Sequence, residues 1–398
     1  MNYIAEEIKQ GIKIHYIKNN KYKTNLVTAF LTVPLDKNTV TENALITSIL
    51  RMWSKTMQTQ EEINKKLEEM YGAEFNCGVE KVGDNQLLKF YIEVLNDEFL
   101  PENKALLIET IDRLLEIIFN PYTENNMFSA KYVQMETNNL RQLIESKIND
   151  KDQYSLDRCI EEMYKEKPYS IYKYGYLENL DNINNEKLYE QYKNLVNTAK
   201  VDIYISGDYD VENIKEHMKS NEIINNLEPR EPKYIVDNEF PATSVEEIIK
   251  SEEKMNVTQG KLVIGLNLEN LNEENTKYVI GIYNVVLGGS ATSKLFQNVR
   301  EKASLAYSAR STYVRQKDNI FIRCGIEINN YEKALEIINK QLEDMKSGDF
   351  TDDELDSAKK TMVAAVKTIQ DEQDNEITYY IAEELSNEEP NFDKYIEE

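Results

Sequence analysis

The stretch LGGSATSKLFQNVREKASLAYSARS, residues 287–311, ends one apolar helix, forms a second helix and leads into a strand. Gly288 and Gly289 predict a sharp end to the first helix, because glycine adopts the positive φ angles that such an end requires. The candidate caps of the next helix, SKLFQNVREK, are the hydroxyl residues Ser290, Thr292 and Ser293. The stretch therefore predicts a helix–turn–helix–strand unit built around a double glycine.

The second part of this stretch holds its functional candidates. Arg300 falls in the last turn of the second helix, where a cation interacts favourably with the helix dipole. The strand LAYSARSTYV is rich in small residues, which permit close backbone approach, so its edge could accept an added peptide strand. Tyr307 in this strand has two possible interpretations, a core residue or an exposed residue of a binding site.

The two halves of the chain repeat one pattern. The apolar strand NLVTAFLTVPL (25–35) precedes the helix ENALITSILRMW, and the strand KLVIGLNLENL (261–271) precedes the helix TKYVIGIYNVVL. Two strands joined by a charged turn are predicted at residues 71–95 and again at 305–328, each followed by long helices. The offset of roughly 235 residues far exceeds solenoid periods and indicates a duplicated domain.

The segment between the halves, residues 225–247, carries three of the chain's eight prolines and has no clear periodicity. Proline breaks helices and stiffens a chain, so this segment is the predicted linker. We expect an α+β protein with a first domain at 1–223, a linker at 224–250 and a second domain at 251–398. Two such lobes on one extended linker predict a clamshell with a ligand cavity between them.

The chain is acidic, with 71 Asp and Glu against 47 Lys and Arg and a net charge of −24. Such a field disfavours nucleic acid and anionic membranes. It suits basic or neutral peptide ligands, or it is a solvated acidic surface without further role. No apolar run approaches the length of a membrane span and the first residues contain no apolar secretory segment, so we expect a cytoplasmic protein.

Metal ligands and nucleophiles are scarce. His15, in an early strand, is expected at the surface or a sheet edge, and His217 lies in a polar helix without a metal-binding motif. Cys77 and Cys324 are expected at equivalent places on core strands, and Cys159 in a helix, each in a packing role. The three cysteines show no CxxC spacing, so neither a zinc ribbon nor a disulfide framework is predicted.

The stretch at 287–311 resembles the signature of the second domain of M16 peptidases, the pitrilysin and mitochondrial-processing-peptidase superfamily, with Leu-Gly-Gly, Ser-x-Leu-Phe, Arg-Glu and Leu-Ala-Tyr. Weaker similarity lies at LEEMYGAEFNCG and SGDFTDDELDSAK. The resemblance implies a repeated α+β domain, in agreement with the duplication. It also implies that Arg300 and Tyr307 bind a peptide carbonyl, with Gly288, Gly289 and Ser290 as further substrate-binding residues.

One departure from the family pattern changes the expected function. Family enzymes carry the zinc motif His-x-x-Glu-His on the first helix of the first domain, and here Ala44, Thr47 and Ser48 stand at those places. The third zinc ligand of the family, a glutamate, falls near Glu136 or Glu145. Without two imidazoles and the general base, the resemblance implies that this chain holds no zinc and activates no water.

This combination resembles the zinc-less subunit of two-chain M16 peptidases. The resemblance implies a heterodimer with a zinc-bearing M16 paralogue, to which this chain contributes Arg300 and Tyr307, and no proteolysis by the chain alone. Zinc is expected on the partner, and a homodimer is possible when the chain is isolated. Two alternatives stay open: a non-enzymatic scaffold or peptide-binding subunit, and a self-sufficient peptidase with an unusual metal site.

Overall fold

The computed structural model describes residues 2–52, 54–57, 59–101, 105–269, 271 and 276–397. It is a mixed α+β structure with two β-sheets, one of six strands and one of three. The chain divides into two compact units, and each unit gathers segments from both halves of the sequence. The first unit comprises residues 1–145, 171–235 and 373–385, and the second comprises 146–170, 236–372 and 386–398.

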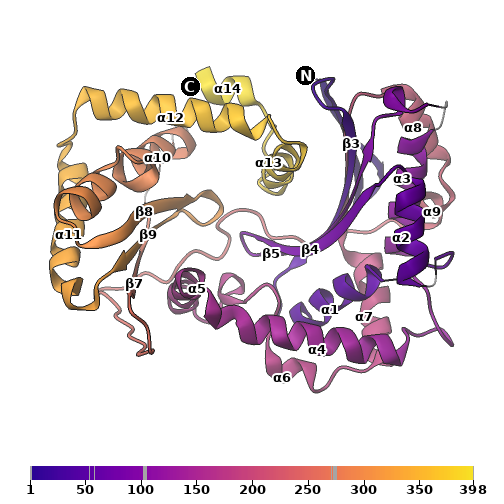
Figure 1. Ribbon diagram of the computed structural model, residues 1–398, viewed down its shortest axis with the longest axis horizontal. Helices are drawn as coiled ribbons and strands as arrows, with labels where there is room; N and C mark the ends of the chain where they lie inside the picture. The colour runs from indigo at the N-terminus through magenta and orange to yellow at the C-terminus, as the bar shows by residue number, and fades with distance from the viewer. Residues whose placement is uncertain are drawn as a thin grey trace. The chain divides into compact units, whose positions relative to one another are not determined.

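The first unit contains the six-stranded sheet, whose strand order is β1-β2-β6-β3-β5-β4. Its strands are β1 (Asn2–Lys9), β2 (Ile12–Lys18), β3 (Thr24–Pro34), β4 (Glu74–Val82), β5 (Asn85–Leu95) and β6 (Lys200–Gly207). Its helices are α1 (Val40–Leu50), α2 (Gln60–Glu69), α3 (Leu106–Phe119), α4 (Ala130–Ser146), α6 (Leu177–Leu180), α7 (Asn185–Thr198), α8 (Val211–Ser220), α9 (Glu222–Asn226) and α13 (Gln373–Leu385). Figure 1 labels most of these elements.

The second unit contains the three-stranded sheet, in the order β7-β9-β8. Its strands are β7 (Gly260–Asn267), β8 (Ala306–Val314) and β9 (Asn319–Ile326). Its helices are α5 (Lys151–Met163), α10 (Thr276–Asn284), α11 (Tyr331–Ser347), α12 (Asp352–Ile369) and α14 (Phe392–Glu397), with two π-helical segments, η4 (Val285–Gly289) and η5 (Phe296–Lys302). Residues 227–259, which include most of the predicted linker, form no helix or strand.

The duplication predicted from the sequence is present in the sheet topology. Strands β3, β5 and β4 occur in the same antiparallel order as β7, β9 and β8. In both units a helix follows the first strand of this triplet, and two long helices follow the last strand in the sequence. The clamshell arrangement of the two units stays a prediction.

Two helices pack in the unit that is formed mainly by the other half of the sequence. Helix α5 follows α4 in the first half but packs on β7 and β9 of the second unit. Helix α13 follows α12 in the second half but packs on β3 and β6 of the first unit. The two halves therefore exchange equivalent helices, which a division at residues 223 and 250 does not describe.

The two faces of the six-stranded sheet differ in chemistry. Because strand residues alternate between faces, one face carries an apolar set that packs under α1, α3 and α7: Ile12, Ile14, Tyr16, Val27, Ala29, Leu31, Leu88, Phe90, Ile92, Val201, Ile203 and Ile205. The other face is equally buried but largely polar: His15, Thr28, Phe30, Thr32, Lys89, Lys200, Asp202, Tyr204 and Ser206. Helix α13 lies on this polar face.

The prediction of an exposed or edge position for His15 is wrong. Its side chain is completely buried, because β1 pairs outside β2 and α13 packs against the sheet. The Nε2 atom lies 3.0 Å from Asp202 Oδ1, and Nδ1 lies 2.8 Å from the Tyr3 hydroxyl. Burial lowers the pKa of His15, so the ring is neutral, donates from Nε2 to the carboxylate and accepts from Tyr3.

Ion pairs fix α13 on the polar face. Glu384 lies 2.8 Å from Lys13 and 3.0 Å from Lys200, which also pairs with Asp202. At the other end of the helix, the Gln373 side-chain amide donates to the Thr24 and Ser206 carbonyls. Such contacts give the helix one position on the sheet, because each buried charge would be costly without its partner.

The same interface also buries polar atoms that have no hydrogen-bond partner among the described residues. They are Thr28 Oγ1, Thr32 Oγ1, Asp202 Oδ2, the Tyr204 hydroxyl and both carboxylate oxygens of Glu376. Glu376 is completely buried on α13, and burial raises its pKa to about 7. An unpaired buried carboxylate opposes folding when it is ionised.

The charge of Glu376 makes the stability of the protein depend on pH. Its pKa in the folded protein lies above the ordinary value of 4.5, so its favourable contribution is present below about pH 4.5 and is lost as the pH rises through about 7. At pH 8 we expect Glu376→Gln to increase the free energy of unfolding by up to about 3 kcal/mol and so to raise the melting temperature. Near pH 4.5 the substitution should change the melting temperature little. Thermal denaturation across this range checks the prediction.

The control is Glu343→Gln on α11, an exposed carboxylate, which should not alter the melting temperature at either pH. An equal gain from Glu376→Gln at both pH values would contradict the assignment of the effect to ionisation.

Gly288 allows η4 to approach strand β8 closely. A Cβ atom at Gly288 would lie 2.5 Å from the Ser311 backbone nitrogen and 2.9 Å from Leu295 Cδ1. The same atom at Gly289 would meet nothing closer than 3.3 Å. The first glycine of the pair therefore has a packing function, whereas the second glycine lies on the exposed side of the turn.

We expect Gly288→Ala to destabilise the protein by roughly 2 kcal/mol, as overpacking against backbone atoms does. The matched variant Gly289→Ala should cost much less, because the atoms around it need to move by only a few tenths of an ångström. Denaturant unfolding of both variants compares them directly, and similar losses for the two would refute the close-approach argument.

Candidate functional site

Arg300 lies on η5, close to the turn into β8. A π-helix is rare and often occurs at functional sites. The guanidinium carbon is 4.5 Å from the centre of the Phe296 ring, and Nε lies 3.6 Å from Glu301 Oε1. The side chain stays 42% exposed, so the ring orients the cation while leaving it accessible to a ligand.

Tyr307 lies at a β-bulge, where its side chain is exposed. Ala306 pairs with Ile326 and Ser308 pairs with Gly325, which leaves Tyr307 as the extra residue of strand β8. Its side chain is 57% exposed, so the interpretation of Tyr307 as a core residue is wrong. Bulges re-aim side chains and are frequent beside active sites.

A tight turn joins these two residues. The Ser304 amide donates to the Arg300 carbonyl, the Leu305 amide donates to the Val299 carbonyl, and Ser304 has a positive φ of 52°. Strand β8 then forms one edge of its sheet. The structure therefore places an exposed cation just before an edge strand and an exposed phenol at the start of that strand.

The helix that contains η5 begins at Lys294, directly after Ser293, and none of the three hydroxyl residues after the double glycine accepts a hydrogen bond from a backbone N–H of its first turn. The Ser293 hydroxyl donates to the Ser290 carbonyl over 2.6 Å, and the Thr292 hydroxyl lies 3.2 Å from that of Ser357 on α12. These contacts stabilise the turn itself and attach it to α12, which corrects the capping prediction.

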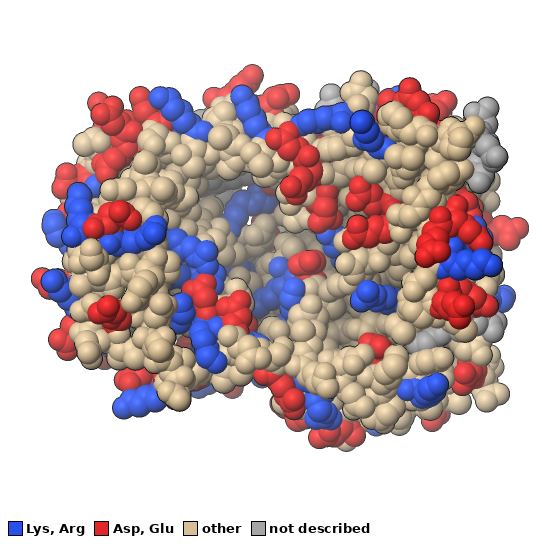
Figure 2. Space-filling view, in the orientation of Figure 1, with Lys and Arg blue, Asp and Glu red and all other residues tan. Residues whose placement is uncertain are grey.

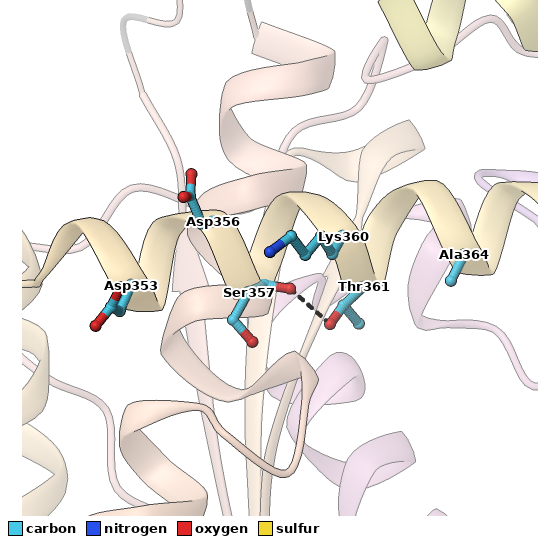
Figure 3. Close-up of a pocket in the computed structure, with 6 residues that line it drawn as sticks. All are labelled: Asp353, Asp356, Ser357, Lys360, Thr361 and Ala364. Atoms are coloured by element: carbon cyan, nitrogen blue, oxygen red, sulfur yellow. Dashed lines mark hydrogen bonds between the residues drawn. The ribbon is translucent and has the colours of Figure 1, made fainter.

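The surface of α12 near this turn holds a hollow of about 420 Å³, lined by Asp353, Asp356, Ser357, Lys360, Thr361 and Ala364. Figure 3 shows that these residues project from one helix, with the Thr361 hydroxyl bonded to the Ser357 carbonyl. A hollow without a second wall buries little of a ligand, so it is not a candidate site.

A better-formed cavity of about 400 Å³ lies in the first unit, between α1 and α4 and over β4. We call it the α1–α4 pocket. Helix α1 and the residue that follows it contribute one face, with residues three and four apart: Ala44, Thr47, Ser48 and Arg51. The remaining lining residues are Met52, Gln60, Cys77, Gly78, Val79, Glu136, Asn139, Leu143 and Tyr174.

The three positions of the expected metal motif therefore line one cavity, and Glu136 lines it with them. Glu145 is not among the lining residues. Arg51, which belongs to no motif in the sequence, also lines the pocket. Its spacing from Ala44, Thr47 and Ser48 on one helix face is the signal that could have identified it.

The charges in this pocket are Glu136 and Arg51. Glu136 is 8% exposed and accepts a hydrogen bond from the Asn139 amide at 3.1 Å. Burial raises the pKa of Glu136, while the Asn139 bond and the Arg51 charge oppose the shift. Both charges also act on the thiol of Cys77, whose pKa burial raises to about 12, so the three side chains share one electrostatic environment.

The donor set of the pocket does not fit zinc. Ala44 offers a methyl group, the Thr47 hydroxyl donates to the Asn43 carbonyl, and the Cys77 thiol is held protonated and contacts the Thr47 carbonyl. In the part of the chain that the structure describes, no group of three or more His, Cys, Asp or Glu side chains could hold a metal ion. A zinc site needs at least three such ligands, so no catalytic step can be assigned to these residues.

The other candidate nucleophiles have packing roles. Burial raises the pKa of the Cys324 thiol to about 12 and that of Cys159 to about 11, so neither is a thiolate near neutral pH. Cys77 lies on β4 and Cys324 on β9, which are the first and second strands of the repeated pair, so the prediction of equivalent places is wrong. His217 is bonded to Asp112 at 2.8 Å.

In the view of Figure 2, acidic and basic side chains are interspersed, and no single patch of one charge dominates the face that is shown. None of the helices that the structure describes is both long and apolar enough to span a membrane.

Known proteins share this fold and sequence pattern. Residues 182–362 match the family described as the peptidase M16 inactive domain. A protein of Bacillus subtilis (strain 168) described as the probable inactive metalloprotease YmfF is 32% identical over 372 residues, which cover 90% of this chain and 84% of that protein.

Solved structures agree with these sequence matches. A conserved protein from Enterococcus faecalis V583 is 25% identical with a TM-score of 0.89, over 100% of this chain and 92% of that chain. A peptidase M16 inactive domain from Pseudomonas fluorescens is 15% identical with a TM-score of 0.76, over 100% and 91% of the two chains. The chain belongs to the M16 peptidase family, as an inactive homologue whose first helix lacks the family's metal-binding motif.

Proposed function

We propose that this chain is the non-catalytic subunit of a two-chain peptide-processing protease. It binds peptide and contributes Arg300 and Tyr307 to a zinc-bearing M16 paralogue. The observation that carries the proposal is the contrast between two sites of one chain. The Arg300–Tyr307 segment keeps the family's residues on an exposed turn, whereas the three metal-motif positions carry a methyl group and two hydroxyls.

The chemistry of the Arg300–Tyr307 segment suits a peptide carbonyl. A guanidinium donates charge-assisted hydrogen bonds, and a phenol adds a second donor that can orient the same oxygen. The edge position of β8 leaves backbone groups for pairing with an extended peptide. The partner chain would supply the metal and the activated water, and we expect both chains in the cytoplasm.

The first test uses the complex. A pull-down from the native cell should recover a similar-sized protein bearing His-x-x-Glu-His, and the reconstituted pair should cleave peptides that neither chain cleaves alone. Arg300→Ala or Tyr307→Phe should lower kcat/KM by about 100-fold, the loss typical of a donor to the transition state. Co-purification of the two chains should not change.

Two controls match these variants. Lys302→Ala removes a cation from the same helical turn, and Tyr331→Phe removes a partly exposed phenol at the start of α11; both should keep activity. A complex that keeps full activity with Arg300→Ala and Tyr307→Phe would instead support a scaffold role.

The second test concerns metal. The isolated chain, incubated with zinc and then desalted, should retain far less than one equivalent by elemental analysis, because the α1–α4 pocket lacks imidazole ligands. The triple variant A44H/T47E/S48H rebuilds the motif and should bind zinc. In that background Glu136→Gln should weaken binding more than Glu145→Gln, because Glu136 alone of the two lines the pocket. Stoichiometric zinc in the wild-type chain would overturn the proposal.

A further inference from the structure

The α1–α4 pocket contains two opposite charges that are not paired with each other. Arg51 makes no side-chain hydrogen bond or ion pair with any residue that the structure describes, and the contact recorded for the Glu136 side chain is the Asn139 amide. Left apart, the two charges offer one anionic and one cationic contact inside a single space.

The anionic contact is fixed in position. Glu136 is more than nine-tenths buried, and its Oε1 atom is held by Asn139 from the next turn of α4. A buried carboxylate is stabilised by a cation with hydrogen-bond donors. The α-ammonium group of an amino acid or a short peptide is such a cation.

The cationic contact lies at the end of the opposite helix. Arg51 is an exposed residue that directly follows the last residue of α1, where a positive side chain is favoured by the helix dipole. The guanidinium is suited to a carboxylate, and the Ser48 hydroxyl on the same helix face can add a donor. A ligand that satisfies both helices therefore carries an ammonium and a carboxylate.

The volume and the lining residues of the cavity further restrict the class of ligand that could bind there. A volume of about 400 Å³ lies at the lower end of the range of roughly 300–1,000 Å³ for small-molecule sites. The apolar lining residues are Ala44, Met52, Val79 and Leu143. They suit aliphatic side chains between the two charged ends.

We propose that the α1–α4 pocket binds a small zwitterion, a free dipeptide with apolar side chains, with its ammonium on Glu136 and its carboxylate on Arg51. The site takes the space of the lost metal site and would let short peptides bind to the first unit. This proposal does not depend on the proposed role of Arg300 and Tyr307, which lie in the second unit.

Calorimetry with the full chain tests both charged contacts. The ligands are Leu-Leu, N-acetyl-Leu-Leu and Leu-Leu amide. Wild-type protein should bind Leu-Leu, and each blocked form should bind about tenfold more weakly, since each loses one charge-assisted contact. In Glu136→Gln, acetylation should no longer matter, whereas amidation still should. In Arg51→Gln, the reverse should hold.

Controls on α4 are Glu145→Gln and Lys131→Gln, both outside the pocket, which should keep the wild-type preferences. No binding of Leu-Leu at millimolar concentration, or equal affinity for free and blocked forms, would overturn the proposal.

A second measurement needs no variant in the pocket. Cys77 is a partly exposed lining residue, whereas Cys159 belongs to the second unit. Leu-Leu should slow the reaction of methyl methanethiosulfonate with Cys77 and leave Cys159 unchanged. Binding without protection of Cys77 would place the ligand elsewhere and refute the assignment.

Discussion

The fold depends on covering both faces of each sheet, and the cover of one face comes from the other half of the sequence. Helix α13 lies on the polar face of the six-stranded sheet, and α5 lies on the face of the three-stranded sheet that carries Gly265 and Phe321. A Cβ atom at Gly265 would lie 2.1 Å from Met163 Sδ on α5, so a glycine permits this contact. Neither sheet is complete without the exchanged helix, because an exposed face would leave apolar or charged groups unpartnered.

Local patterns in the sequence predicted the elements within each half. The alternation of Leu88, Phe90 and Ile92 and the double glycine at 288 and 289 are short-range signals. The structure confirms the strand pairs and a helix that ends at Gly289, but neither glycine has the positive φ angle on which the prediction of a sharp end rested. The exchange of α5 and α13 could not be predicted in this way, since it depends on contacts between residues more than a hundred positions apart. The misplacement of His15 has the same cause. Its burial is produced by Tyr3 and α13, and nothing in the sequence around His15 indicates either.

The candidate sites also combine features that local sequence predicts with features that depend on distant contacts. Family resemblance identified Arg300 and Tyr307 by their sequence context, but it did not predict the bulge that exposes Tyr307. A bulge adds one residue to one strand, and it becomes visible only when the partner strand is placed. Arg51 was missed because the family pattern directs attention to positions 44, 47 and 48, whereas a helix brings position 51 to the same face.

The three positions at which family enzymes carry the metal motif line an open cavity in this chain. If Ala44, Thr47 and Ser48 had been replaced by large apolar residues, the space between α1 and α4 would be filled and its polar groups removed. Small and hydroxyl side chains instead leave about 400 Å³ open, with Glu136 and Arg51 on its walls. A buried carboxylate without a full set of partners is costly. A ligand cation that pairs with Glu136 removes this cost, and a carboxylate on the same ligand can pair with the exposed Arg51.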